Sequence, residues 1–326
     1  MRGLSPGQQC EVWIASATGA LDLAYSTGNM LLEAPNWSLD GSSLILNGDG
    51  KLWRLGLADG SLAEVPVTGV PALNNDHVLA PDGKTIYVSA DDGHIYRAPL
   101  AGGPATRVTG NDGSFHFLHG VSPDGSELAY VGIEAGDFTR PGRLVTMPSD
   151  GGAAAAVDVG PGHCDGPEYS PDGKWLYLNT ESFSTVPGHA QLARVRPDGS
   201  QFEQLLASGT VDWFPHLSPD GSLASYVRFP AGTQGHPADL PVDVVLVATD
   251  DWATPLQTWP VSGGQGTLNV NSWSPASDRF ACVAYPGREQ PAAELKPAAT
   301  RATKAPGRTR GPGQRRTLPP GGPLPS

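Results

Sequence analysis

Short apolar runs alternate with polar turns along most of the chain. A turn signature, S-P-D-G or a close variant, precedes runs rich in β-branched, aromatic and aliphatic residues, such as 85–88 and 128–131. In such a turn Pro presets φ, Asp accepts hydrogen bonds from the next amides, and Gly tolerates positive φ. We therefore expect the signature Asp residues to form turns rather than to catalyse. The six copies begin at Ser38, Ala80, Ser122, Ser170, Ser218 and Ser274, the last in the degraded form S-P-A-S.

The spacing of the signatures defines an internal repeat. Successive copies lie 42, 42, 48, 48 and 56 residues apart, which is the period of a propeller blade. Each period also contains a second Asp- or Gly-rich turn, as at 58–60 and 197–199. Two turn signals at hairpin distance predict four antiparallel strands per blade. The sequence therefore predicts an all-β, six-bladed β-propeller.

The two ends of the repeat region complete each other. The last signature is followed by one β-rich run, 280–283, so the sixth blade lacks its outer half. Residues 11–15 and 21–25 are separated by a turn and read as the missing strands. We expect these N-terminal strands to close the last blade, which removes exposed sheet edges. Cys10 and Cys282 should then lie on neighbouring strands.

Composition and charge narrow the class of protein. The 42 Gly and 32 Pro exclude a helical bundle, whereas eight each of Trp, Tyr and Phe supply a core. Three cysteines are too few for a disulfide scaffold, and the first nine residues lack the apolar core of a signal peptide. No stretch of eighteen apolar residues is present. We therefore expect a cytoplasmic protein that does not enter a membrane.

The charge is unevenly distributed. Of the net charge of −12, residues 288–326 contribute +6, which leaves −18 for residues 1–287. We assign 1–287 to the propeller and 288–326 to a disordered, basic Pro/Gly-rich tail, either a solvated appendage or a functional basic arm. The acidic body argues against a nucleic-acid partner. We expect a monomer that binds a small molecule or a protein at its channel mouth.

Histidines concentrate just before the signatures, where the innermost strand of each blade faces the channel. Five of the eight fall in this window of four successive blades: His77, His116, His119, His163 and His216. Equivalent positions of a ring converge, so these side chains should meet at one mouth. They indicate either a divalent, manganese-like metal site or a polar channel lining. Further ligand-binding candidates in this window are Asp76, Asp165, Glu168, Asp212 and Trp213.

The signature turns, the blade spacing and the split last blade resemble TolB-type β-propeller repeats over Cys10–Tyr285. Such repeats also occur in relatives of prolyl oligopeptidase and in oligogalacturonate lyase. The single G-x-S-x-G match, residues 3–7, lies ahead of the first predicted strand and is therefore no nucleophile elbow, which excludes a peptidase as written. In oligogalacturonate lyase, histidines and a glutamine hold a manganese ion in the channel. That resemblance implies metal ligands at His119, His216 and Gln265, followed by His77 and His163.

Two functions remain open. The first is a binding module with a His-lined mouth, and the second is a manganese-dependent, oligogalacturonate-lyase-like enzyme acting on an acidic sugar. Few basic residues lie near the channel segments, and an acidic body repels a polygalacturonate chain, so binding ranks first. His236 lies in a long insertion of the fifth blade, which we expect to overhang one face of the ring.

Overall fold

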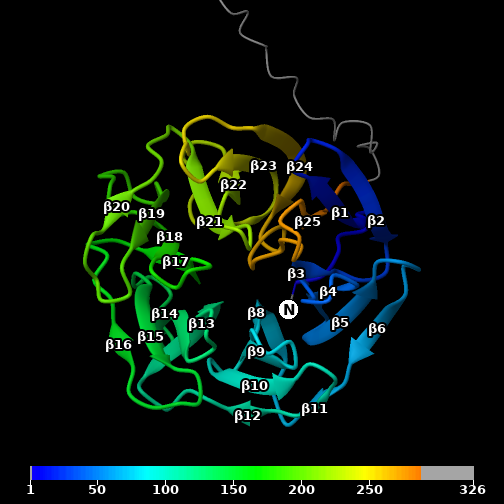
Figure 1. The fold of residues 1–326 in the computed structure, drawn as a ribbon, viewed down its shortest axis with the longest axis horizontal. Coiled ribbons are helices and arrows are strands. Elements are labelled where there is room, and N and C mark those ends of the chain that lie inside the picture. Colours follow the sequence, from blue (N-terminus) through cyan, green and yellow to red (C-terminus); the bar gives the residue numbers. More distant parts are fainter. Residues whose placement is uncertain (1, 288–326) are drawn as a thin grey trace, which may run out of the picture.

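The chain forms a ring of six β-sheets around a central channel (Figure 1). This computed structural model describes residues 2–287, and the predicted tail, 288–326, lies outside them. The predicted all-β propeller is confirmed. Since residues 2–287 contain no helix, they contain none that could cross a membrane.

Five blades are four-stranded antiparallel sheets, with the innermost strand first in the chain. The first blade comprises β3 (Glu33–Trp37), β4 (Ser43–Gly48), β5 (Lys51–Gly56) and β6 (Leu62–Val65). The second comprises β8 (Leu73–Leu79), β9 (Thr85–Ala90), β10 (Ile95–Pro99) and β12 (Thr106–Arg107). The third comprises β13 (Ser114–Val121), β14 (Glu127–Glu134), β15 (Arg143–Pro148) and β16 (Ala155–Ala156).

The remaining blades follow the same order. The fourth comprises β17 (Cys164–Tyr169), β18 (Leu176–Thr180), β19 (Gln191–Val195) and β20 (Glu203–Gln204). The fifth comprises β21 (Val211–Leu217), β22 (Leu223–Phe229), β23 (Ala238–Ala248) and β24 (Gln257–Gly264). A short parallel pair, β7 (Val67–Thr68) and β11 (Gly103–Pro104), adds a seventh, two-stranded sheet.

The sixth blade is closed by the N-terminal strands, as predicted. β1 (Cys10–Ser16) pairs with both β2 (Leu21–Thr27) and β25 (Arg279–Ala284). The innermost segment of this blade pairs with β25 through one bridge, between Trp273 and Phe280. Cys10 and Cys282 do occupy neighbouring strands, but they belong to different core clusters because their side chains face opposite sides of the sheet. All three cysteines are buried and free.

The signature residues form turns for the reason that the sequence indicates. In the third blade Ser122 Oγ donates to Asp124 Oδ1 at 2.6 Å, and Ser126 N donates to the same oxygen at 3.0 Å. Gly125 follows with a φ of 75°. These hydrogen bonds lower the pKa of Asp124 to about 2, so the carboxylate is committed to its turn. The expectation that signature Asp residues form turns is confirmed.

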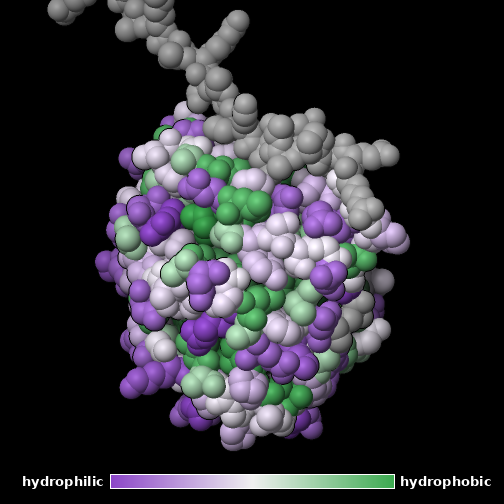
Figure 2. Space-filling model, turned by 90° about the vertical axis from the view of Figure 1, so that its right-hand side faces the viewer, coloured by the Kyte–Doolittle hydropathy of each residue, from purple (hydrophilic) through white to green (hydrophobic). Residues whose placement is uncertain are grey.

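The core lies between blades rather than in the channel. Its largest fully buried side chains include Trp213, Trp259 and Phe280, which belong to one cluster joining the fifth and sixth blades. Figure 2 views the ring from the right-hand side of Figure 1 and shows hydrophobic side chains interspersed with polar ones on this edge. The blades thus bury their apolar faces against each other and leave polar groups for the channel.

Candidate functional site

The channel has two different mouths. The innermost strands end at the signature turns, so these turns surround one mouth, which we call the turn mouth. The opposite mouth, where the innermost strands begin, is called the loop mouth. A cavity of about 340 Å³ opens at the turn mouth. The second residue of every signature lines it: Leu39, Pro81, Pro123, Pro171, Pro219 and Pro275.

The side of the channel near the turn mouth holds a fully bonded polar group. Glu168 Oε2 lies 2.5 Å from His216 Nδ1, while Asn271 Nδ2 donates to Glu168 Oε1 at 2.7 Å. His216 Nε2 donates to the carbonyl of Leu268 at 3.0 Å. Both ring nitrogens of His216 are therefore engaged within the protein. His216, a predicted metal ligand, instead connects its own blade to the fourth and sixth blades.

Three imidazoles from separate segments converge on one carboxylate inside the channel, between the loop mouth and the turn-mouth cavity, which His119 also lines. His119 Nε2, from β13, lies 3.0 Å from Asp165 Oδ1. His163, just before β17, and His236, in the insertion between β22 and β23, each place Nε2 3.7 Å from Asp165 Oδ2. We call these four residues the Asp165 cluster. The side chains of His163 and His236 are 25% and 26% exposed, so the cluster can be reached from solvent.

The charges of this cluster depend on each other. Burial opposes a charge on His119, but the carboxylates of Asp76 and Asp165 raise the pKa of His119 to about 9. Burial would raise the pKa of Asp165, yet His119 and His163 hold it well below its usual range. Burial raises the pKa of Asp76 to about 6. Burial also lowers the pKa of His236, which favours a neutral imidazole with an available lone pair.

His163 has a different hydrogen-bonding role from its neighbours. Its Nδ1 accepts the backbone N–H of Gly142 at 2.8 Å, so the ring proton is on Nε2 and faces Asp165. His119 has the reverse arrangement, with Nδ1 3.4 Å from the carbonyl of Asn269. His119 Nε2 is therefore the better placed of the two to bind a metal once it loses its proton.

An aromatic wall with a strained backbone supports the cluster. Phe214 has a φ of 56°, an unusual value for a bulky residue. Its ring centroid lies 5.8 Å from that of His119 and 5.1 Å from that of His236. The ring of Trp213 lies 4.4 Å from His236, centroid to centroid. Trp213 thus forms part of the wall of the site. The strained backbone of Phe214 holds the Phe214 ring toward the imidazoles.

Gln265 also lies at the loop mouth. Its side chain is beside His236 and contributes to the electrostatic environment of that imidazole. Gln265 Oε1 is buried and has no hydrogen-bond partner within residues 2–287. An unpaired buried acceptor is costly in a folded protein, so this oxygen is available to a ligand.

Three sequence-predicted residues are directed elsewhere. His77 Nε2 donates to the carbonyl of Ile45 at 3.3 Å, in the contact between the first two blades, and burial lowers the pKa of His77 to about 4. His116 bonds to the carbonyl of Gly93 and to Asp112. Asp212 accepts from Ser208 at 2.5 Å and lies opposite Arg228 on β22. The expected convergence of all five histidines on one mouth is wrong, because the structure separates them into several sites.

The structure adds His236 to the site. The sequence indicated its place on an insertion over one face of the ring but not its contact with Asp165. As the side chains stand, no three His, Cys, Asp or Glu residues within 2–287 are arranged to hold a metal ion. A metal would therefore require a change of side-chain orientation in the cluster.

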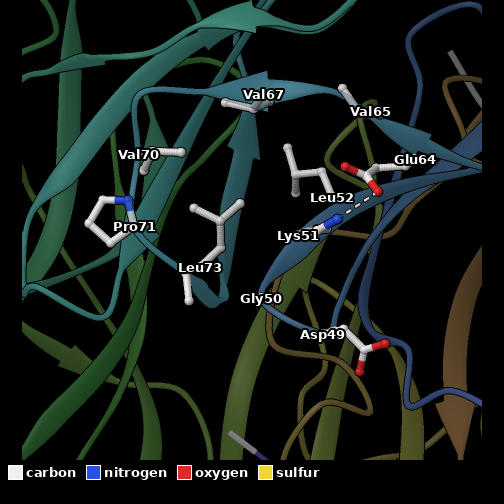
Figure 3. A pocket seen from close by; sticks show the side chains of 11 residues that line it. Asp49, Gly50, Lys51, Leu52, Glu64, Val65, Val67, Val70, Pro71 and Leu73 are labelled. Atoms are coloured by element: carbon white, nitrogen blue, oxygen red, sulfur yellow. Dashed lines mark hydrogen bonds and ion pairs between the residues drawn. The ribbon is translucent and has the colours of Figure 1, made fainter.

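Grooves between blades provide a contrast to this site. Figure 3 shows one of about 260 Å³ where the chain passes from the first blade to the second. Leu52, Val67 and Leu73 line it, and Lys51 forms an exposed ion pair with Glu64 at 2.8 Å. A similar groove follows the third blade. Both hollows lie where the chain crosses from one blade to the next, and of the predicted metal ligands only His163, which precedes Cys164, lies next to one of them.

Comparisons with known proteins identify the family. No protein-family model matches the chain. An uncharacterized protein of Agrobacterium fabrum is 41% identical over 261 residues, which cover 78% of this chain and 85% of that protein. The solved structure of a putative TolB from Agrobacterium tumefaciens is 38% identical, with a TM-score of 0.77 over 86% of this chain and 99% of that one.

A more distant structure shares the fold alone. Oligogalacturonate lyase in complex with manganese is 15% identical, with a TM-score of 0.50 over 82% of this chain and 74% of that one. The repeat, the closed ring and the similarity over nearly the full length of the Agrobacterium relatives agree. The chain belongs to the TolB-like family of six-bladed β-propellers.

Proposed function

We propose that this propeller is a non-catalytic binding module that takes a divalent metal ion or a small ligand at its loop mouth. The observation that carries the proposal is the contact of Asp165 with three imidazoles from three different segments. Two of those imidazoles are reachable from solvent. The Asp165 cluster concentrates titratable side chains around one buried carboxylate, which is unusual for residues that only line a channel.

The cluster brings together the donor atoms that a metal ion needs, and a reorientation of these side chains would be required to surround the ion. His119 and His236 lie 3.0 and 3.7 Å from Asp165. Two ligands of a tetrahedral ion with bonds of about 2.1 Å are separated by roughly 3.4 Å. We assign Asp165, His119, His236 and Gln265 as the ligand set, which suits manganese- or zinc-like ions. His163 would orient Asp165 through its Nε2–H rather than bind the ion.

This set differs from the one that the lyase resemblance implies. His119 and Gln265 are shared, whereas His216 and His77 are bonded to Glu168 and to backbone carbonyls. The lyase alternative needs cations for an acidic sugar. Arg2, which reaches the loop mouth, is already paired with Glu33 and Asp239. Binding without catalysis is therefore the better supported function.

The proposed module would act as a monomer in the cytoplasm. Three free, buried cysteines are compatible with a reducing compartment. The acidic body would bring cations to the mouth rather than nucleic acid. Size-exclusion chromatography with light scattering tests the monomer, and a larger species would contradict it.

Calorimetric titration with Mn²⁺ and with Zn²⁺ tests the proposal. We expect one ion per chain at pH 7.5, with release of the proton that His119 holds because its pKa is about 9, and weaker binding at pH 5, because protons compete for the imidazoles. Asp165→Asn should weaken binding by about tenfold to a hundredfold. Asp172→Asn, which alters a signature turn of the same blade, is the matched control and should bind normally. Absence of binding to both ions, or full binding by Asp165→Asn, would reject the metal site.

A further inference from the structure

The side chain of Arg2 fills a pocket at the rim of the loop mouth. The described chain begins close to the centre of the ring, where N marks its end (Figure 1). The pocket is built from Glu33 on β3, Asp239 on β23, Gln265 after β24 and Tyr285 after β25. These segments belong to the first, fifth and sixth blades. One guanidinium thus connects elements that are distant in the sequence.

The geometry of this pocket suits a guanidinium. Arg2 Nη1 lies 3.0 Å from Glu33 Oε1 and 2.7 Å from the carbonyl oxygen of Gln265. Its Nη2 lies 2.9 Å from Asp239 Oδ1, and its central carbon lies 4.3 Å from the ring centroid of Tyr285. A planar group with several donors satisfies two carboxylates, a carbonyl and an aromatic face at once, which an ammonium does less well.

The pocket needs a cation. The side chain of Glu33 is only 12% exposed, and burial raises its pKa. Tyr285 is fully buried. If Arg2 leaves, Glu33 becomes a buried carboxylate without its partner, which is unfavourable. Another cation would relieve that cost, and the charge of −18 on residues 1–287 attracts one.

The segment that carries Arg2 is anchored at its far end and less firmly attached at its start. Within it, Gln8 N donates to the carbonyl of Ser5, and Ser5 N donates to Gln8 Oε1. Leu4 packs partly against the core of the sixth and first blades. Gln8 Nε2 anchors the far end on Asp239 at 2.7 Å and on the carbonyl of Tyr285 at 3.1 Å, and Gln9 N donates to the carbonyl of Pro286. Arg2 precedes these points, and its ion pairs with Glu33 and Asp239 hold the start of the described segment on the rim.

We propose that the Arg2 pocket is a guanidinium-recognition site, which Arg2 occupies as a tethered stand-in for a ligand. An arginine side chain of a peptide or a small guanidine competes with Arg2 for Glu33, Asp239 and Tyr285. The proposal rests on the proposed function, because it specifies a cationic organic group as the ligand class of the same mouth. Gln265 joins the two sites, since its carbonyl binds the guanidinium while its side chain lies beside His236.

The occupation of the pocket by Arg2 determines how tightly an added guanidinium ligand should bind. A ligand can bind only the fraction of molecules in which Arg2 has left, so the apparent affinity of the wild type is reduced by that fraction. If the open state is between 1 and 10% populated, removing Arg2 should strengthen binding by about tenfold to a hundredfold.

The test uses agmatine, a small guanidine, with the full-length protein. Arg2→Ala should bind agmatine with a Kd about tenfold or more below that of the wild type. Agmatine should also raise the Tm of that variant. Tetramethylammonium, a cation without N–H donors, is the control and should do neither. The tripeptide Gly-Arg-Gly distinguishes a peptide source from a small guanidine according to which of the two binds more tightly.

The outcomes for the guanidinium site are as follows. Saturable agmatine binding by Arg2→Ala that is lost on adding Glu33→Gln supports the site, whereas no binding by folded Arg2→Ala overturns it. If Arg2→Ala does not fold, hydrogen exchange of the wild type replaces it: agmatine should speed exchange in residues 2–8, and unchanged exchange overturns the proposal. Asp165→Asn in the Arg2→Ala protein should keep agmatine binding, so failure of the metal site and failure of the guanidinium site are distinguishable.

Discussion

His119 Nε2 lies 3.0 Å from Asp165 Oδ1, which links the innermost strands of the third and fourth blades. Both side chains are nearly inaccessible to solvent, at 3% and 12% exposure. A buried pair of this kind is costly to break, because the remaining partner keeps an uncompensated charge. The pair therefore contributes to the position of the channel strands as well as to the proposed site.

A double-mutant cycle measures this relationship. His119→Gln leaves Asp165 buried with weaker partners, and Asp165→Asn leaves His119 facing Asp76 alone. Each single change should lower the free energy of unfolding by about 3 to 5 kcal/mol, and the double change should cost clearly less than their sum. Urea denaturation at pH 7 provides the values. The exposed pair of Lys51 and Glu64 is the control, with an expected coupling below about 1 kcal/mol. Additive costs at His119 and Asp165 would contradict the pairing.

His77 should make stability depend on pH. Burial lowers its pKa to about 4 in the folded protein, against about 6.5 in the unfolded chain. Between these values the unfolded state binds more protons, so the contribution of His77 is complete above pH 6.5 and is lost as the pH falls toward 4. The loss amounts to about 3 kcal/mol. Denaturation of wild type and His77→Gln at pH 7 and pH 4.5 should show a smaller decrease for the variant, and parallel decreases would refute this.

At position 214 we expect the glycine variant to be more stable than the alanine variant, which is the reverse of the usual order. Its buried ring means that Phe214→Ala costs about 3 to 5 kcal/mol. Because its φ is 56°, Phe214→Gly also relieves backbone strain and should be about 1 kcal/mol more stable than Phe214→Ala. Phe229 is equally buried on β22 without a positive φ, so there Ala should be better than Gly. The same order at both positions in urea denaturation would argue against strain at Phe214.

The N-terminal strands should be essential for closure. Deleting residues 1–26 removes β1 and all of β2 except Thr27, and exposes the edge of β25. We expect aggregation or a fall in Tm of at least about 10 °C, since buried side chains such as Val12 and Trp13 are lost as well. Deleting residues 288–326 should leave the Tm nearly unchanged. Calorimetry and light scattering check both, and a stable monomer without residues 1–26 would mean that the ring closes differently.

The sequence by itself determined the fold. Its signature turns act locally: Ser122, Asp124 and Gly125 need only each other to make their turn, so the turn can be recognised without a structure. Counting those turns predicted the six blades, and the apolar runs at the two ends predicted the pairing of β1 with β25. The position of the innermost strand just before each signature then limited the candidates for the channel to a few short windows.

Only the tertiary structure decided which of those candidates meet. His77 and His119 stand at the same offset from their signatures, yet one bonds to Ile45 and the other contacts Asp165. The innermost strands contain register shifts, such as those between Leu73 and His77 and between Leu118 and Gly120. A shift of one residue turns a side chain to the other face of a strand, so equal spacing does not ensure equal direction. His236 reaches Asp165 through an insertion that makes long-range contacts, among them the hydrogen bond from Gln234 Nε2 to the carbonyl of Pro187.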